Sequence, residues 1–508
     1  MNHADFIKSY NHLLDQMARA NPTRLFWATD FASKNRISCA LPDLMQKLAV
    51  KGSINPVAEN QWIKGFLFRC KRIIGVFYHA FIMTMRMAQA RRLRPSLDPQ
   101  KTYTVLKTFI YDHSFDSQGQ YKDAFFNRLP GHLQPKRNLI IYAHILGSYA
   151  ACLRKIPSCG QTIIPMEALL TFKDIMRISV ELLFGRLQVP GDVLFAKQNV
   201  SRIVAHEFWR TFKGIQFWQM AHFEATVNLA KSCRMDQFIM TYENYPWERM
   251  VLMALRQQSP STKTIGYQHT VVPQAYLNYF VSDSEKAQGL LPDRVLTVGE
   301  EPARIMRLYG QYEGVDVQPA CALRISLNAQ PCQALEALKI RRVLLPLEGF
   351  YHVYPMVAYV LEQLGQKEGY DVRIRTHPLL PWGQFEQKYH PHVLRYGNVS
   401  ISQKVPLKED LEWADVVMYW SSTVSLEALM HGKPVIHYQM TPGLSFDPLF
   451  ACDNFKWTIN GQSKLTDLLF SIQTLGVEQV RLQQQGAKEY LARYFHPVNE
   501  TSLNKFIF

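Results

Sequence analysis

The sequence lacks the motifs that usually indicate a metal or cofactor site. Its eight cysteines include no CxxC pair and have no histidine nearby in metal-ligand spacing, which argues against a disulfide framework or zinc site and indicates reduced thiols. Neither GxxxxGK[ST] nor GxGxxG occurs, so the two common glycine-rich phosphate loops are excluded. The sequence also contains no pair of acidic residues that would indicate a divalent-metal site. We therefore expect neither a bound metal nor a cofactor.

An export signal and internal repeats are also missing. The first residues, MNHADFIKSYNHLL, do not show a charged stretch followed by an apolar one. The remaining composition is that of a globular protein, with 47% hydrophobic residues over 508 positions, which is too long for one typical domain. We expect a cytoplasmic protein with two large α/β domains.

The net charge of +15 and pI near 9.3 indicate an anionic partner. Basic residues bracket an apolar run at 73–85, a pattern typical of an interfacial segment on an anionic membrane. These residues are Lys64, Arg69, Lys71, Arg72, Arg86, Arg91, Arg92 and Arg94. The run is too short to predict a transmembrane helix, and a buried core helix with a solvated basic face is the alternative. No recognition motif accompanies the charge, so we do not expect nucleic-acid binding.

Apolar runs and turn residues predict the domain organisation. A first Rossmann-like domain with helical insertions is expected over 1–300, a linker over 301–340, a second Rossmann-like domain over 341–490 and a tail over 491–508. We expect the first strand at 24–29. The polar residues that follow it, Asp30, Ser33, Lys34 and Asn35, are expected at the carboxyl end of the sheet, where α/β folds place ligands.

In the first domain, two consecutive predicted strands end in polar residues. Glu243 follows the strand at 237–241, and His269 follows the strand at 263–267. An acid and an imidazole at neighbouring strand ends can act as a base and a phosphate-contacting group. Arg249, in the same segment as Glu243, is assigned to the substrate site. The alternative is that Glu243 caps the next helix and His269 is a structural loop residue.

The second domain contains the larger group of candidates. Polar residues follow its successive strands: Glu348 and Gly349, then Arg375 and His377, then Ser421, Ser422 and Thr423, with Glu427 one turn into the next helix. Parallel strands bring their carboxyl ends to one rim, so we expect these side chains to converge there. The arginine and histidine can bind a phosphate, the hydroxyls and helix amides can hold its oxygens, and Glu427 can accept from a ribose hydroxyl. An ordinary capped helix is the alternative for 421–423.

Two motifs carry a family resemblance. The run SSTVSLEALMHGKPVI at 421–436 resembles the GT-B glycosyltransferases. Together with RTHP, which ends in His377 and Pro378, it resembles bacterial sialyltransferases, capsule Kdo transferases and teichoic acid glycerophosphate polymerases. The resemblance covers about the last 170 residues, and YENYPWER and IGYQH add a looser likeness to surface-polysaccharide biosynthesis proteins.

The resemblance implies a metal-independent GT-B enzyme whose two Rossmann-like domains face each other across a cleft. The donor would be a CMP-activated acidic sugar, of Kdo or nonulosonate type, with His377 and the hydroxyls on its phosphate. The acceptor would be a surface glycan, such as capsule, lipopolysaccharide or O-antigen, at the inner face of the cytoplasmic membrane. The acidic motif of the sialyltransferases is missing, so the base is assigned to Glu243, with Asp123 and Asp112 as alternatives.

Other functions remain open on the same architecture. The donor could be a UDP-sugar, a GDP-sugar or CDP-glycerol, and the reaction could be a nucleotide-sugar 2-epimerisation. A non-catalytic GT-B scaffold that binds lipid-linked glycan or a partner enzyme is the alternative outside enzymes. Sequence alone does not separate these.

Overall fold

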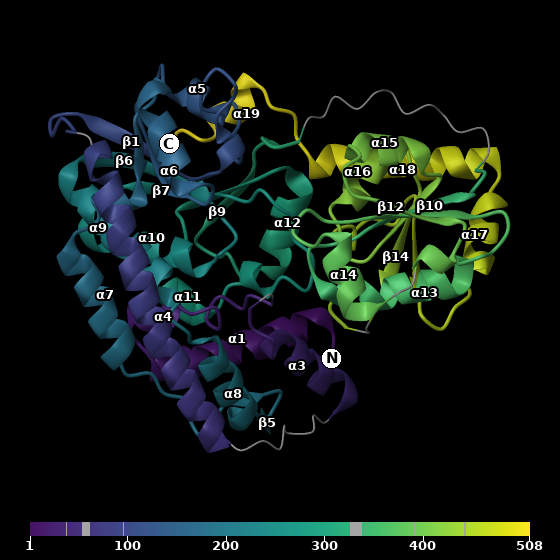
Figure 1. Cartoon of the computed structure of the whole chain (residues 1–508), viewed down its shortest axis with the longest axis horizontal. Helices are drawn as coiled ribbons and strands as arrows, with labels where there is room; N and C mark the ends of the chain where they lie inside the picture. The colour runs from purple at the N-terminus through teal and green to yellow at the C-terminus, as the bar shows by residue number, and fades with distance from the viewer. Residues whose placement is uncertain (37, 53–60, 95, 326–337, 391–392, 441–442) are drawn as a thin grey trace. The chain divides into compact units, whose positions relative to one another are not determined.

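The chain forms two compact α/β units (Figure 1). The computed structural model describes residues 1–36, 38–52, 61–94, 96–325, 338–390, 393–440 and 443–508, apart from the side chains of 61–66 and 394. The first unit consists of Met1–Thr270, Tyr276–Ile325 and His496–Phe508, and the second of Val271–Ala275 and the described part of Ser326–Phe495. The prediction of two α/β domains is therefore confirmed.

The first unit is built on a seven-stranded parallel sheet in the order β3-β2-β1-β6-β7-β8-β9. Its central strands are long and almost wholly buried, as expected for a parallel sheet covered on both faces. The strands are β1 Thr102–Ile110, β2 Asn138–Ile145, β3 Ile163–Pro165, β6 Arg234–Thr241, β7 Lys263–Tyr267, β8 Arg294–Thr297 and β9 Asp316–Pro319.

Helices account for most of the remaining first unit. A short antiparallel hairpin is formed by two strands of two residues each, β4 Leu194–Phe195 and β5 Gln198–Asn199. The helices are α1 His3–Ala20, α2 Arg24–Trp27, α3 Leu41–Lys51, α4 Gln61–Ala90, α5 Leu129–Leu133, α6 Tyr149–Lys155, α7 Phe172–Phe184, α8 Ser201–Thr211, α9 Gln216–Ser232, α10 Pro246–Gln258, α11 Asp283–Ala287, α12 Glu300–Tyr309 and α19 Glu500–Asn504. Within the described chain, no helix is both long and apolar enough to cross a bilayer.

The strand predicted at 24–29 is wrong, because these residues form α2 and a turn. Leu25, Phe26 and Trp27 are each at most 1% exposed, so burial explains their apolar character without a strand. Residues 301–325, expected in a linker, instead contain most of α12 and all of β9, and 326–337 lie outside the described residues.

The second unit is a six-stranded parallel sheet in the order β12-β11-β10-β13-β14-β15. Its strands are β10 Arg342–Pro346, β11 Asp371–Arg375, β12 Val399–Ser402, β13 Val416–Tyr419, β14 Val435–Gln439 and β15 Lys456–Asn460. Its helices are α13 Tyr354–Leu364, α14 Trp382–Tyr389, α15 Leu407–Trp413, α16 Val424–Met430, α17 Leu465–Gln473 and α18 Val477–Tyr494. The strand order places β11, β10 and β13 side by side.

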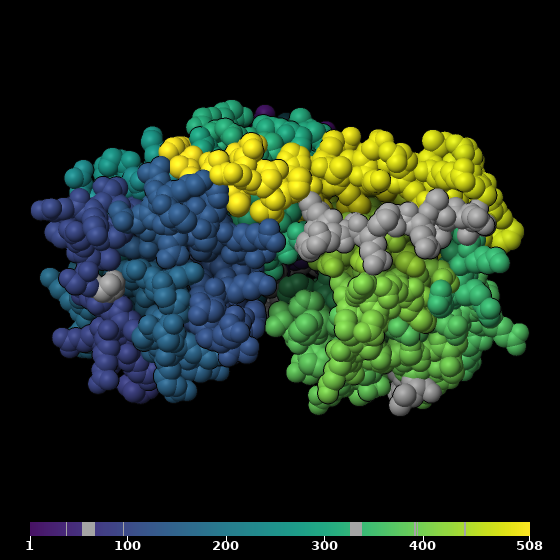
Figure 2. All heavy atoms as spheres, turned by 90° about the horizontal axis from the view of Figure 1, so that it is seen from above, coloured from purple at the N-terminus to yellow at the C-terminus, as the bar shows by residue number. Residues whose placement is uncertain are grey.

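After α18 the chain returns to the first unit. The His496 N–H donates to the Val298 carbonyl, and the Phe508 N–H donates to Gln237 Oε1 on β6 at 2.9 Å. Figure 2 shows these last residues, in yellow, at the molecular surface. The C-terminal segment is therefore an integral part of the first unit.

Candidate functional site

The second unit brings together polar groups from three neighbouring strand ends. The Ser421 N–H, after β13, donates to Glu348 Oε1, after β10, at 2.8 Å. A Cβ placed on Gly349 would lie 2.9 Å from Nδ1 of His377, which follows β11. These residues lie together on one rim, as predicted, because β11, β10 and β13 are neighbours in the sheet. We call Glu348, Gly349, His377 and Ser421 the rim cluster.

The hydrogen bonds of His377 determine which ring nitrogen carries its proton. The Leu379 N–H donates to His377 Nδ1 at 3.1 Å, so this nitrogen acts as an acceptor. Burial lowers the pKa of His377, which keeps the ring neutral at physiological pH. A neutral ring that accepts at Nδ1 carries its proton on Nε2. His377 can therefore offer one directed N–H donor to an anion, and Pro378 occupies the exposed turn beside it.

The two carboxylate oxygens of Glu348 differ in their surroundings. Glu348 is 7% exposed, and burial raises its pKa to about 7 even though Ser421 donates to it. Its second oxygen, Oε2, has no hydrogen-bond partner in the described part of the chain. Near neutral pH the group is present in both protonation states, so it can also donate a proton to an oxygen of a bound anion.

The start of α16 agrees only in part with the prediction. The helix begins at Val424 after the three hydroxyl residues, but Glu348 already occupies the Ser421 N–H. Ser422 is buried, and its hydroxyl accepts from the Val424 N–H at 3.4 Å. Ser421 is partly exposed and Thr423 is exposed, so these two hydroxyls remain reachable from solvent. The expectation that free backbone amides bind the anion is therefore wrong for Ser421.

Arg375 is held within the protein. Its Nη1 donates to the Val405 carbonyl at 2.7 Å and to Asp410 Oδ2 at 2.5 Å, and Asp410 is fully buried. Asp410 also accepts from Arg373 and from Ser402 on β12. The charge of Arg375 is thus paired with Asp410 through Nη1, and phosphate binding by this partly exposed arginine stays a prediction. Burial raises the pKa of the nearby Glu427, and the charge of Arg375 opposes that rise.

In the first unit, Glu243 stands at the carboxyl end of β6, beside β7. Thr270 Oγ1 donates to Glu243 Oε1 at 2.9 Å and also shares a hydrogen bond with the Tyr279 hydroxyl at 2.8 Å. Burial raises the pKa of Glu243 to about 7, against the lowering effects of Thr270 and of the Arg324 charge. A half-buried carboxyl with this pKa is matched to proton removal at neutral pH.

The helix that follows Glu243 is capped by a different carboxyl. Glu248 accepts from the Glu243 N–H at 3.0 Å and from the Tyr245 N–H at 2.9 Å. The Glu243 carbonyl accepts from Asn278 Nδ2 at 2.7 Å. The backbone of Glu243 is thus fixed on both sides while its own carboxyl points elsewhere. The alternative that Glu243 caps α10 is therefore wrong.

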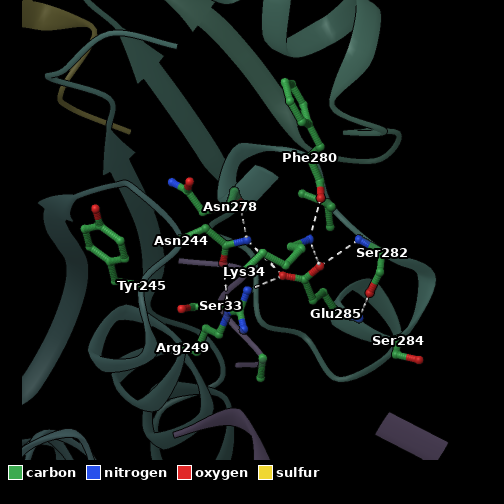
Figure 3. Close-up of polar contacts among 12 residues, drawn as sticks. Ser33, Lys34, Asn244, Tyr245, Arg249, Asn278, Phe280, Ser282, Ser284 and Glu285 are labelled. Atoms are coloured by element: carbon green, nitrogen blue, oxygen red, sulfur yellow. Dashed lines mark hydrogen bonds and ion pairs between the residues drawn. The ribbon is translucent and has the colours of Figure 1, made fainter. Parts of the chain in front are cut away.

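A buried ionic triad, formed by Lys34, Arg249 and Glu285, lies directly behind this turn (Figure 3). All three side chains are 0% exposed. Lys34 Nζ lies 2.8 Å from Glu285 Oε2, and Arg249 pairs with the other oxygen. The side chain of Asn244, whose φ is +56°, accepts from Arg249 Nε and donates to Glu285 Oε1. The triad thereby fixes the left-handed residue next to Glu243.

The triad corrects two predictions. Arg249 was expected in the substrate site, but its guanidinium is fully buried and bound to Glu285 and Asn244, so it positions the turn instead. The polar residues 30–35 were expected at a ligand-binding edge, but Ser33 and Lys34 are both fully buried. Lys34 and Glu285 are 251 positions apart, which explains why no local pattern revealed their pairing.

The two alternative bases make structural hydrogen bonds, whereas His269 keeps its buried Nδ1 without a hydrogen-bond partner among the described residues. Burial and the Arg324 charge lower the pKa of His269 to about 3, so the ring is neutral and packs edge-on against Phe125. Asp123 is 2% exposed and accepts from Tyr121, Phe125 and Phe126. Asp112 accepts from the N–H and hydroxyl of Ser148 at the start of α6. Glu243, by contrast, is partly exposed and has a pKa raised to about 7 by burial.

Sequence reasoning missed the partners of Glu243. Thr270 and Arg324 act on its carboxyl, Asn278 donates to its backbone carbonyl and Tyr279 bonds to Thr270. Each of these residues lies 27 or more positions from Glu243 in the sequence. Thr270 follows His269 directly and is the one residue that the strand-end rule could have found. Among the described residues, no three His, Cys, Asp or Glu side chains gather as a possible metal site.

One substitution tests the close packing within the rim cluster. Gly349→Ala should displace the His377 ring, because the new Cβ would come within 2.9 Å of Nδ1 and within 3.3 Å of the Leu379 side chain. We expect the variant to fold and to bind nucleotide about tenfold or more weakly, a cost of about 1.4 kcal/mol. Nucleotide titration by calorimetry measures this. Gly383→Ala on α14, which meets no atom within 4 Å, is the matched control.

Comparison with known proteins gives fold-level similarity only. The sequence matches no family profile and no curated protein. Among solved structures, α,α-trehalose 6-phosphate synthase from Burkholderia multivorans is 10% identical with a TM-score of 0.45, covering 80% of this chain and 95% of that one. HepE of Anabaena, solved with UDP and glucose, is 10% identical with a TM-score of 0.44, covering 80% and 98%.

A third similar structure is the UDP-GlcNAc 2-epimerase from Neisseria meningitidis bound to UDP-GlcNAc. It is 11% identical with a TM-score of 0.40, covering 76% of this chain and 94% of that one. At such identities and at TM-scores below 0.5, none of these similarities indicates an activity for this chain.

Proposed function

We propose that this protein is a metal-independent GT-B glycosyltransferase that transfers a sugar from a nucleotide donor to a glycan acceptor. The observation that carries the proposal is the rim cluster, in which three adjacent strand ends bring together a directed N–H donor, a carboxyl with a pKa of about 7 and the partly exposed Ser421 hydroxyl. Such a set of donors suits the phosphate of a departing nucleotide.

In this reaction Glu243 takes the proton from the acceptor hydroxyl, and the acceptor oxygen forms the new bond to the anomeric carbon. The bond from that carbon to the donor phosphate breaks, and the phosphate leaves with the electron pair. His377 Nε2–H and the hydroxyls of Ser421 and Thr423 stabilise its charge. The pKa of about 7 at Glu243 supports its role as the base.

We further propose the identity of the sugar donor, the acceptor and the cellular location of the reaction. The donor is a CMP-activated acidic sugar of Kdo or nonulosonate type, and the acceptor is a surface glycan such as capsule, lipopolysaccharide or O-antigen. The motifs around His377 and Ser421 support the cytidine nucleotide. The protein would act on the cytoplasmic side of the inner membrane, which the basic residues around the apolar run 73–85 support.

A nucleotide panel tests the proposed donor. CMP should raise the unfolding temperature more than CDP, UDP or GDP, since a ligand at about 100 times its Kd stabilises by about 2.7 kcal/mol. His377→Ala should lose this stabilisation because it removes the directed donor. His390→Asn is the matched control, since His390 is exposed and its φ of +47° is tolerated by asparagine.

The other outcomes separate the alternatives. Stabilisation by UDP or GDP instead of CMP would show that the donor is a UDP-sugar or a GDP-sugar. Turnover of the donor without any acceptor would indicate an epimerase. No stabilisation by any nucleotide would refute the enzymatic proposal and leave a non-catalytic scaffold.

A further inference from the structure

An exposed apolar surface covers the outer sides of α4 and α7, which pack side by side (Figure 1). Eleven large apolar side chains on these two helices are 43–75% exposed. They are Leu67, Ile73, Ile74, Phe77, Tyr78, Phe81 and Met85 from α4, and Phe172, Met176, Val180 and Phe184 from α7. We call them the α4–α7 surface. Monomeric soluble proteins rarely expose so large an apolar area without a binding role.

The way α4 is attached explains why its apolar residues stay outside. Its buried contacts form one narrow stripe, with Val76, Met83 and Ala90 at a spacing of seven residues. Gly75 packs so closely on Gly214 that a Cβ on Gly214 would lie 2.2 Å from the Gly75 carbonyl carbon. This stripe uses a small part of the apolar run 73–85. The alternative that 73–85 is a buried core helix with a solvated basic face is therefore wrong.

Helix α7 adds a second apolar row that the sequence did not reveal. Phe172, Met176, Val180 and Phe184 recur every four residues and face outward. The inner side of the same helix buries Ile175, Ile178 and Leu182, so both sides of α7 are apolar. An amphipathic helix that only covered the core would present polar residues at these outer positions.

The charge around the surface is of one sign. Between Glu59 and Asp98 the chain contains no Asp or Glu. Arg69, Lys71, Arg91, Arg92 and Arg94 are exposed along this segment, and Lys173 and Arg186 are exposed on or just after α7. Arg177 is also exposed but is paired with the buried Glu224. The acids of α7 present no free negative charge, because Asp174 is buried and Glu181 pairs with Arg24. The side chain of Lys64 lies outside the described residues.

A cavity of about 700 Å³ lies between the first half of α4 and the segment that follows α7. Arg69 and Arg72 of α4 and Arg186, just after α7, line it together with Phe68, Trp209 and Phe212. None of the three arginines makes an ion pair in the described part of the chain, and Arg72 Nε is buried without a hydrogen-bond partner. Unpaired arginines beside aromatic rings fit a phosphate group attached to an apolar chain.

We propose that the α4–α7 surface docks on a bilayer containing anionic lipid, and that the cavity beside it receives the phosphate of one lipid headgroup. The apolar side chains would enter the boundary between headgroups and acyl chains while the basic residues meet the anionic headgroups. This proposal depends on the two helices and the cavity and does not require the transfer reaction.

Vesicle flotation tests the proposal with the full chain and no nucleotide sugar present. The protein should float with vesicles of phosphatidylcholine mixed with phosphatidylglycerol, and much less with phosphatidylcholine alone. Phe77→Ser/Phe81→Ser and Phe172→Ser/Phe184→Ser should each weaken binding about tenfold or more. Arg69→Gln/Arg186→Gln should weaken it about fivefold for each arginine removed. Phe470→Ser and Arg481→Gln, at exposed positions of the second unit, are the matched controls.

Several results would overturn the proposal. Equal flotation with both vesicle types would show that anionic lipid is not required. Unchanged binding by the Phe172→Ser/Phe184→Ser variant would show that α7 takes no part in membrane binding. Failure to float, combined with a dimer that Phe77→Ser/Phe81→Ser converts to a monomer, would identify a protein interface. Stabilisation by inorganic phosphate without vesicle binding would identify a site for a soluble anion.

Discussion

Replacing Glu243 with glutamine should lower the rate of sugar transfer by about 10²- to 10⁴-fold, the range that a general base contributes. Glutamine keeps the size of the side chain and can still accept the hydrogen bond from Thr270, so the fold should persist. Because the pKa of Glu243 is about 7, the unmodified protein should lose activity about tenfold per unit below pH 7, where Glu243 is protonated. Steady-state kinetics across pH measure both effects.

The control for this prediction is Asp112→Asn, since Asp112 is the exposed acid that follows β1 and was an alternative base. It should leave kcat nearly unchanged. Nucleotide stabilisation of Glu243→Gln should equal that of the unmodified protein, because the rim cluster lies in the other unit. Full activity of Glu243→Gln, or loss of activity only in Asp112→Asn, would show that Glu243 is not the base.

Replacing Glu285 with glutamine should destabilise the first unit by about 3–5 kcal/mol, the typical cost of breaking a buried ion pair. Glu285 is the single carboxylate between Lys34 and Arg249, and all three side chains are 0% exposed. Burial alone would raise the pKa of Glu285, but these two cations outweigh it and lower that pKa. Without the carboxylate, two positive charges would remain buried with no counter-charge.

Urea unfolding followed by tryptophan fluorescence measures this effect, with the two units treated as separate transitions. Glu300→Gln is the matched control, because it breaks a half-exposed pair with Arg307 and should cost about 1 kcal/mol or less. Should Glu285→Gln fail to accumulate, adding Lys34→Met should recover part of the loss by removing one unpaired charge. A loss no larger than that of Glu300→Gln would contradict the stabilising role of the triad.

Parallel strands were the most predictable part of the fold. The strand at Lys263–Tyr267 has the expected bounds, and four of its five residues are buried, as is typical of strands covered on both faces. The same rule failed at 24–29, because a short buried helix such as α2 produces the same apolar run. Length was the only available discriminator, and it was not decisive over six residues.

The candidate site could be predicted where it depends on topology. The meeting of Glu348, His377 and Ser421 follows from strand order, which the alternation of strands and helices implies. The burial of Arg249 and the pairing of Arg375 with Asp410 could not be predicted, because both depend on partners brought close only by tertiary packing. The outward row on α7 was missed because its four-residue spacing also describes a core-facing helix.

The return of His496–Phe508 to the first unit has a consequence for biosynthesis. The side chain of Gln237 on β6 donates to the Phe506 carbonyl and accepts from the Phe508 N–H, and both phenylalanines leave the ribosome after the whole second unit has been translated. The second unit can therefore complete its core during translation, while the first must wait with part of its sheet uncovered. A chain whose translation stops before residue 496 would therefore have an unfinished first unit, although that unit was begun first.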